Sequence, residues 1–355
     1  MKPPKNTILK LLIFLSLMTL SACVFRTQRT QESLPVPTPE TASTLQAAPS
    51  STPAEPTTVV PALQFVPGRN DYTITVDDTK REFIVYVPAG YDPKRPTPVV
   101  LMFHGSNQSG NAMYERTGWV AQAEKENFIV VFPTSWKYLL TSSNKVEDKW
   151  YDLVMEATEP SVKFKDDVHF VKVILDQLNA TFNVDKKRIF ATGFSNGAYF
   201  VVTRLLVQMN DVFAAFATGG MGPSPASANE MIDTTVQINA SLYKMFGTRD
   251  TLIAELLGLS VPFPFKADEI MNDPNFGPML TRTAAQLELD SAYTQQSDAN
   301  VTTLTFNQSL VGADNELIFQ MIRGMPHAYP NGSNNPAGLD AAVLFWEFFM
   351  RHPAP

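Results

Sequence analysis

The chain of 355 residues is long enough for a leader segment and one large domain, and 44% of its residues are hydrophobic. Charged residues make up 18%, which is ordinary for a globular protein with a sizeable core. The formal net charge is −7 and no basic patch stands out, so nucleic acid is not expected as a partner.

The first 23 residues have the pattern of an export signal. A lysine-containing start is followed by the apolar run 8–20, which is short for a membrane span. The run ends in Leu20-Ser21-Ala22-Cys23, which resembles the cleavage box of bacterial lipoproteins, whose cysteine becomes the lipidated first residue. A plain secretory signal or an uncleaved anchor are the alternatives, but Cys23 is the only cysteine of the chain. We therefore expect a lipoprotein signal peptide over 1–23, a lipid anchor at Cys23 to the cell membrane, and an extracytoplasmic domain without intrachain disulfides.

Residues 24–66 are dominated by Pro, Thr, Ser, Ala and Gln and show no apolar periodicity. This composition is typical of an extended, disordered tether that holds a domain away from a membrane surface. A proline-rich docking ligand is the alternative interpretation. Residues 67–355 then fit one catalytic domain.

The domain begins with two predicted strands, 72–76 and 83–87, joined by a turn at 77–80, which form a hairpin at one edge of a sheet. The run 98–103 is continuously apolar, as in a strand buried on both faces, and ends in His104-Gly105-Ser106. A helix is expected over 117–127 and a second buried strand over 128–132. The long connection 133–165 is rich in aromatic residues, which either line a binding site or pack onto the domain.

A strong helix is predicted from Asp166-Asp167, because an apolar stripe follows at helical spacing and acidic residues suit the positive end of a helix. His169, in its first turn, is expected to be a surface or packing histidine. The next stretch reads as a strand, a sharp turn and a helix, with Gly193, Ser195 and Gly197 in a G-x-S-x-G pattern. In this pattern the serine hydroxyl points outward from a strained turn.

Three further strands are predicted over 212–218, 242–246 and 317–322, and a closing helix over 341–351. Strands alternate with helices, so we expect an α/β fold with a doubly wound, mostly parallel sheet and an antiparallel N-terminal hairpin. Ligands collect at the carboxyl ends of strands in such sheets. Ser195, Asp250, His327 and the pair His104-Gly105 all follow predicted strands.

A serine hydroxyl needs a base, and the base needs a partner that fixes its tautomer. We predict Ser195 as nucleophile, His327 as base and Asp250 as the acid, in the chain order of α/β-hydrolases. A capping role is the alternative for Asp250, and Asp290 and Asp314 are weaker candidates for the acid.

The oxyanion donors are expected to be the backbone N–H groups of Asn196 and of Ser106, with Gly105 as the alternative to Ser106. His104 is expected to orient its loop. A role for His104 as the general base is the less favoured alternative.

These motifs together resemble the polyhydroxybutyrate depolymerase and feruloyl/acetylxylan esterase group of α/β-hydrolases. The resemblance covers about 81–352 and rests on 103–105, 150–152, 166–171, 188–198, 246–250 and 324–332. It implies a secreted serine esterase with the triad Ser195, Asp250 and His327, acting on polysaccharide-linked feruloyl or acetyl esters or on polyhydroxyalkanoate-type esters. No metal or cofactor is implied.

The chain departs from the group at three places. The loop after His104-Gly105 continues as Ser-Asn-Gln rather than as a glycine run, the domain lacks cysteine pairs, and 252–289 is unusually apolar and is expected to form a lid or an acyl pocket. The alternative functions are a peptidase or acyltransferase on the same fold, or a non-catalytic surface binding lipoprotein.

Overall fold

The computed structural model describes residues 62–224 and 236–355. The expected signal peptide, Cys23 and most of the expected linker lie outside these residues. At the described end of that linker, the backbone N–H of Leu63 donates to Oγ1 of Thr181 at 2.8 Å, and its side chain packs against the main core. Contacts with the domain therefore begin upstream of residue 67. Within the described ranges, no helix has the length and apolar character needed to cross a membrane.

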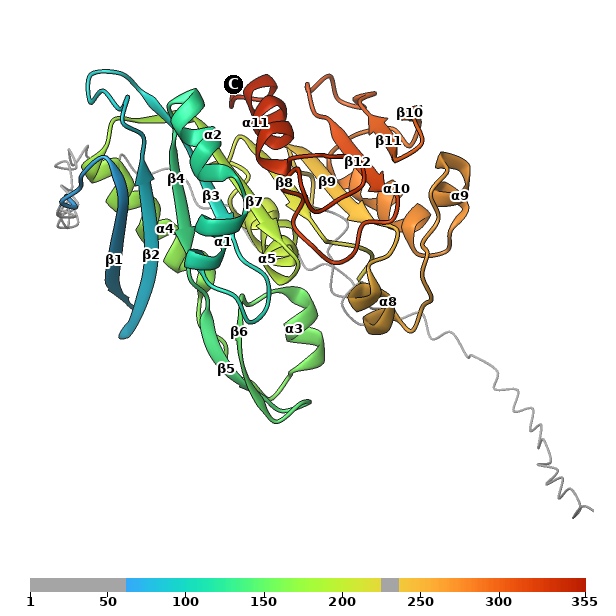
Figure 1. The fold of residues 1–355 in the computed structure, drawn as a ribbon, viewed down its shortest axis with the longest axis horizontal. Helices are drawn as coiled ribbons and strands as arrows, with labels where there is room; N and C mark the ends of the chain where they lie inside the picture. Colours follow the sequence, from blue (N-terminus) through green and yellow to red (C-terminus); the bar gives the residue numbers. More distant parts are fainter. Residues whose placement is uncertain (1–61, 225–235) are drawn as a thin grey trace, which may run out of the picture. The chain divides into compact units, whose positions relative to one another are not determined.

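A ten-stranded sheet within the described residues forms the frame of the domain, in the order β1-β2-β4-β3-β7-β8-β9-β12-β11-β10 (Figure 1). The strands from β4 to β12 in this order pair in parallel, and both ends of the sheet are antiparallel. The bounds are β1 (Gly68–Val76), β2 (Thr79–Val87), β3 (Thr97–Phe103), β4 (Ile129–Pro133), β7 (Val184–Phe194), β8 (Ala215–Gly219), β9 (Ser241–Gly247), β10 (Thr294–Ser297), β11 (Val301–Phe306) and β12 (Leu317–Ile322).

The predicted fold class and the N-terminal hairpin are confirmed, and the sheet has a second antiparallel edge that the sequence did not predict. This edge is formed by β10 and β11. All residues of β10 are exposed, and β11 alternates threonines with apolar residues. Such a strand carries a weak hydrophobic signal, which explains why it was missed.

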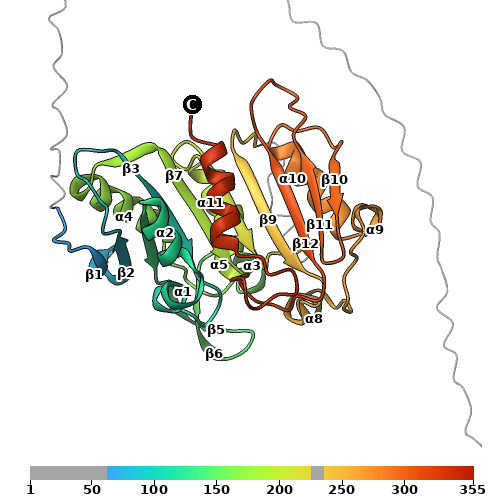
Figure 2. The same cartoon turned by 45° about the horizontal axis from the view of Figure 1, so that its top comes forward.

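Helices cover both faces of the sheet, because successive residues of the central strands point to opposite sides. Along β3, Val99, Leu101 and Phe103 belong to one core cluster, while Val100 and Met102 belong to the other. The first face carries α4 (Asp167–Thr181), the continuous helix α5 (Asn196–Phe200), η1 (Val201–Leu205) and α6 (Leu206–Gln208), and also α8 (Thr251–Leu257), α9 (Ala267–Asn272) and α10 (Phe276–Gln286). The second face carries α1 (Gly110–Arg116), α2 (Trp119–Glu126) and α11 (Ala341–Arg351), and α2 and α11 lie in front of the strands in Figure 2.

The connection 133–165 has secondary structure of its own. It contains the hairpin of β5 (Trp136–Leu140) and β6 (Lys145–Lys149), followed by α3 (Leu153–Thr158). Two of its aromatic side chains, Tyr138 and Trp150, are buried. Of the two roles considered for its aromatic residues, packing therefore holds for these two.

The unusual segment 252–289 forms most of α8 and all of α9 and α10. Phe263, Phe265 and Phe276 from this segment are buried in the main core cluster. In contrast, Leu252 and Leu256 on α8 are exposed. The buried phenylalanines make the segment part of the core of the domain, and its expected role as a lid or an acyl pocket stays a prediction.

Candidate active site

The predicted turn around Ser195 joins β7 directly to α5. Ser195 has φ 53° and ψ −121°, a strained backbone conformation for a residue with a side chain. A Cβ atom at Gly193 would lie 2.4 Å from the carbonyl oxygen of Gly197, and one at Gly197 would lie 2.4 Å from that of His104. The two glycines therefore allow the strand, the helix and the loop after β3 to approach closely enough to form this turn.

The side chains of Ser195, His327 and Asp250 form a hydrogen-bonded chain at the carboxyl ends of β7, β9 and β12. Nε2 of His327 lies 2.9 Å from Oγ of Ser195, and Nδ1 lies 2.7 Å from Oδ2 of Asp250. Ser195 is 9% exposed and Asp250 is 1% exposed, so both lie in a largely water-excluded environment. With the imidazole neutral and protonated on Nδ1, Nε2 is free to accept the serine proton.

Asp250 also caps a helix. Its Oδ1 accepts a hydrogen bond from the backbone N–H of Ile253 at 3.0 Å, while Oδ2 faces His327. The two interpretations of Asp250, helix cap and partner of the histidine, therefore both describe its geometry. Of the weaker acid candidates, Asp290 accepts from the backbone of Ala292 and Asp314 is exposed, and neither has a recorded bond to His327.

His104 is buried and engages both ring nitrogens away from Ser195. Its Nδ1 lies 2.7 Å from the carbonyl oxygen of Gly105, and its Nε2 accepts from the backbone N–H of Ser135 at 2.9 Å. Burial lowers the pKa of His104 to about 4, so the ring is neutral at pH 7. These contacts match the expected loop-orienting role and leave no nitrogen free for a base. His169 is exposed and pairs with Asp77, as expected for a surface histidine.

The loop that carries the second expected oxyanion donor passes close to Ser195, because a Cβ atom at Gly105 would lie 3.1 Å from Cβ of Ser195. Asn196 is the first residue of α5, so its backbone N–H has no partner within the helix. In the loop, the backbone N–H of Gly105 donates to Oε1 of Gln108 at 3.2 Å, whereas no acceptor within the described residues is recorded for that of Ser106. This arrangement favours Ser106 over Gly105.

The side chain of Asn196 ties the serine turn to the segment 150–152, a role that the sequence analysis did not predict. Its amide bonds to both the backbone N–H and the carbonyl oxygen of Trp150, at 2.7 and 3.1 Å, and donates to Oδ2 of Asp152 at 2.5 Å. The indole N–H of Trp150 donates to the carbonyl oxygen of His104 at 3.0 Å. The segment 150–152 therefore links the serine turn to the loop after β3. The Trp-Tyr-Asp motif was the available signal, although it did not reveal this partner.

Burial raises the pKa of Asp152 to about 6, although the carboxylate also accepts from the backbone N–H of Met155. A neighbouring acid, Asp167, is equally buried and binds Arg81 and the backbone N–H of Tyr151. In the residues that the structure describes, no group of three or more His, Cys, Asp or Glu side chains could hold a metal ion.

Comparison with known proteins shows what this chain is similar to. Residues 89–261, which include Ser195 and Asp250, match the family model described as Phospholipase/Carboxylesterase. The chain is 28% identical over 185 residues to a bifunctional acetylxylan esterase/xylanase of Neocallimastix patriciarum, an alignment that covers 50% of this chain and 24% of that protein. It is 31% identical over 140 residues to the poly(3-hydroxyalkanoate) depolymerase C of Paucimonas lemoignei, over 39% of this chain and 30% of that protein. The chain thus spans less than a third of the length of each of these relatives.

Solved structures share the fold. The acetyl xylan esterase from Aspergillus awamori superposes with a TM-score of 0.51 at 15% identity, over 79% of this chain and 99% of that one. An S-formylglutathione hydrolase from Agrobacterium tumefaciens gives 0.51 at 12% identity, over 81% and 95%. The resemblance expected from the sequence is therefore confirmed: the chain is related to carboxylesterases and has the α/β-hydrolase fold.

Proposed function

We propose that this carboxylesterase-type α/β-hydrolase is a serine carboxylic-ester hydrolase that works through a covalent acyl-enzyme. The single observation that carries this proposal is the hydrogen-bonded chain from Oγ of Ser195 through the imidazole of His327 to Oδ2 of Asp250. Packing alone gives no reason for a strained serine, a histidine and a buried carboxylate from three separate strands to be aligned in this way.

In the first half of the reaction, Oγ of Ser195 attacks the ester carbonyl carbon while Nε2 of His327 takes the hydroxyl proton. Asp250 holds the proton on Nδ1 and stabilises the imidazolium that forms. The carbonyl oxygen becomes an oxyanion, and the backbone N–H groups of Asn196 and Ser106 face it. Collapse of this intermediate expels the alcohol, which receives its proton from His327, and leaves the acyl group on Ser195.

In the second half, His327 removes a proton from water, and the resulting hydroxide attacks the acyl carbon. The same two N–H groups stabilise the second oxyanion. Collapse releases the carboxylic acid, and the proton returns from His327 to Oγ of Ser195.

The test is hydrolysis of a short p-nitrophenyl ester together with labelling by a fluorophosphonate probe. The wild-type protein should turn over the ester and carry one covalent label, and Ser195→Ala should lose both while keeping its thermal unfolding transition. The matched control is Ser109→Ala, which alters the cap of α1 and should keep the activity. Turnover that persists in Ser195→Ala would rule out the assigned nucleophile, and an unlabelled wild-type protein would indicate a binding protein.

For the substrate, we propose acetyl or feruloyl esters on a polysaccharide, or poly(3-hydroxyalkanoate) esters. The names of the relatives support acetylxylan and poly(3-hydroxyalkanoate), and the sequence resemblance adds feruloyl esters. Acetylated xylan, a feruloylated arabinoxylan fragment and a hydroxybutyrate oligomer form the panel that separates them. A matched peptide amide and an alcohol acceptor test the peptidase and acyltransferase alternatives. Amide cleavage at a rate comparable with ester cleavage would move the assignment to a peptidase.

We also propose that the enzyme is extracytoplasmic and tethered to a membrane by a lipid on Cys23, through the Pro-rich segment that follows. The Leu-Ser-Ala-Cys box and the single cysteine of the chain support this. Mass spectrometry of the N-terminal peptide should find a diacylglyceryl group in the wild-type protein and none in Cys23→Ala. An unmodified Cys23 in membrane fractions would contradict the anchor.

A further inference from the structure

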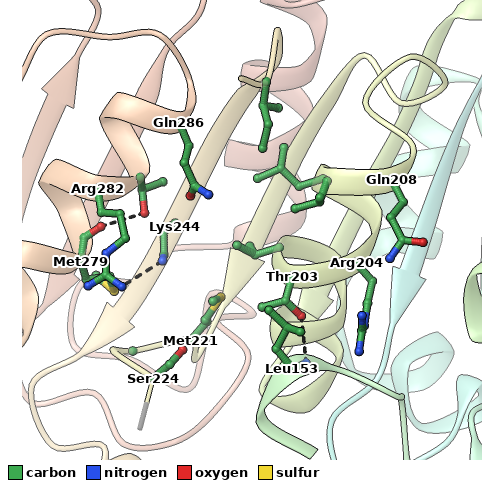
Figure 3. Close-up of a pocket in the computed structure, with 16 residues that line it drawn as sticks. Leu153, Thr203, Arg204, Gln208, Met221, Ser224, Lys244, Met279, Arg282 and Gln286 are labelled. Atoms are coloured by element: carbon green, nitrogen blue, oxygen red, sulfur yellow. Dashed lines mark hydrogen bonds between the residues drawn. The ribbon is translucent and has the colours of Figure 1, made fainter. Parts of the chain in front are cut away.

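A cavity of about 190 Å³ lies away from Ser195, on the first face of the sheet (Figure 3). It is lined by side chains from β9, from the helix formed by η1 and α6, and from α10. Most of its wall is apolar, with Val202, Leu206, Val207, Met221, Ile238 and Met279 contributing. A buried lysine interrupts this wall.

Lys244 lies in the middle of β9 and is 1% exposed. Its ammonium group has one recorded hydrogen-bond acceptor within the described residues, the thioether sulfur of Met279 at 3.5 Å. A thioether is a weak acceptor, and among the residues that the structure describes no acidic side chain lines the cavity. Because a buried ammonium group without a counter-charge is costly, this lysine is one that an incoming anion would stabilise.

Among the described residues that line the cavity, the other charged side chains are also positive. Arg282 of α10 lines the cavity, as Figure 3 shows, and takes part in no ion pair within the described chain. Arg204 of η1 is already neutralised by Glu156 and lies over the ring of Tyr151. The described part of the cavity wall therefore carries an excess of positive charge from Lys244 and Arg282.

We propose that this cavity binds a small organic carboxylate with an apolar body, whose carboxylate group pairs with Nζ of Lys244 and with Arg282. The volume suits a single ring or a short branched chain, since an apolar cavity of about 150 Å³ is known to hold benzene. Inorganic phosphate fits less well, because the apolar walls would leave most of its oxygens without donors.

This site is separate from the proposed catalytic site. Lys244 pairs with Thr218 on β8, which pairs with Gly193 on β7, so Lys244 and the serine turn are two strands apart. Ser195, Asp250 and His327 do not line the cavity. The inference therefore goes beyond the proposed hydrolysis, and its failure would leave that proposal untouched.

Calorimetric titration of the full chain with benzoate at pH 7 tests the proposal, with benzamide as the uncharged probe. Benzoate should bind the wild-type protein and the control Lys172→Met, an exposed lysine on α4, with equal affinity. Lys244→Met should weaken benzoate binding by about 10- to 100-fold, the usual effect of one charged hydrogen bond, and Arg282→Gln by a smaller factor. Neither substitution should change p-nitrophenyl acetate hydrolysis, and benzamide should bind weakly to every variant.

The pH dependence gives an independent test that needs no variant. Burial lowers the pKa of Lys244 to about 8. The other charged groups at the described cavity wall are Arg204, which is paired with Glu156, and Arg282. Benzoate itself stays ionised over this pH range, so the pH dependence tests the charge of Lys244. Benzoate affinity should therefore fall by up to roughly tenfold per pH unit above about pH 8. A flat profile, equal binding to Lys244→Met, or no binding at 10 mM benzoate, roughly the weakest useful affinity, would each overturn the proposal.

Discussion

The rim of the sheet where the proposed catalytic residues Ser195, Asp250 and His327 lie differs from the Lys244 cavity in how the chain satisfies its buried polar groups. At the rim, the buried side chains of His104, Asn196 and Asp250 are all hydrogen-bonded, which fixes the positions of the reacting atoms. In the cavity, the ammonium group of Lys244 meets a thioether. Side chains whose positions must stay fixed need hydrogen-bond partners within the chain. A side chain that binds a ligand must instead leave a hydrogen-bond position unoccupied for it.

The largest expected effect comes from breaking the rim at Asp250. Asp250→Asn keeps a side chain that can cap α8, but it allows the wrong tautomer of His327. We expect kcat for a p-nitrophenyl ester to fall by about 10⁴-fold, as in other triads, with little change in the unfolding midpoint. Asp290→Asn is the matched control and should leave kcat unchanged. A normal rate in Asp250→Asn would move the acid role to another carboxylate.

The second prediction tests whether the hydrogen bonds of the Asn196 side chain stabilise the protein. Asn196→Ala leaves the backbone donor in place but removes the amide that bonds to Trp150 and Asp152. Because Asp152 and the N–H of Trp150 then lose a buried partner, we expect the free energy of unfolding to fall by roughly 2–4 kcal/mol. Denaturant unfolding measures this, and Asn210→Ala near the end of α6 should change it by less than about 0.5 kcal/mol.

Much of the fold could be predicted from the sequence because its central strands are buried on both faces. Each residue of β3 and of β9 is buried, so these strands appear as continuous apolar runs, interrupted at Lys244. The hairpin of β5 and β6 was missed because β6 is mostly charged and has no buried residue, which hides the partner of β5. The edge strand β10 was missed because all of its residues are exposed. Strands are predictable where burial leaves a pattern.

The same reasoning explains which site residues the sequence revealed. Ser195, Asp250 and His327 each follow a buried strand, so their shared edge could be inferred without coordinates. The bond between Asn196 and Asp152 joins a helix start to a distant loop, and no local pattern records it. Lys244 sits inside an apolar strand, where the sequence reads only as a core position with one polar residue.

The third prediction concerns the loss of stability in acid, which should depend on the buried His104 and not on the exposed His169. The folded-state pKa of His104 is about 4, below the ordinary value of 6.5, so the unfolded chain takes up a proton at a higher pH than the folded one. The stability that depends on a neutral His104 is complete above about pH 6.5 and is lost as the pH falls toward 4. His104 by itself should contribute a loss of roughly 2 kcal/mol at pH 5. Asp152, whose folded-state pKa is raised to about 6, acts in the opposite direction and offsets part of this loss.

Urea unfolding of the wild-type and His104→Gln proteins at pH 7 and pH 5 isolates this contribution. Between pH 7 and pH 5, His104→Gln should lose roughly 2 kcal/mol less than the wild-type protein, whatever its effect on absolute stability. His169→Gln, which alters an exposed histidine, should keep it. An unchanged slope in His104→Gln would assign the acid sensitivity to other groups.

The smallest expected effect is that of Lys244→Met on stability. It is the sharpest test of the comparison, because this substitution should raise the free energy of unfolding, whereas Asn196→Ala should lower it. Lys244→Met replaces a buried ammonium group, which has no acidic partner among the described residues, with an apolar side chain of similar length beside Met279. We expect the free energy of unfolding to rise by roughly 1–3 kcal/mol at pH 7, since isolated buried charges are usually costly. The gain should shrink above about pH 8, where the folded-state lysine is already neutral. Lys172→Met should change little. If Lys244→Met were instead destabilised like Asn196→Ala, Lys244 would be a partnered structural residue, and the distinction between the two regions would fail.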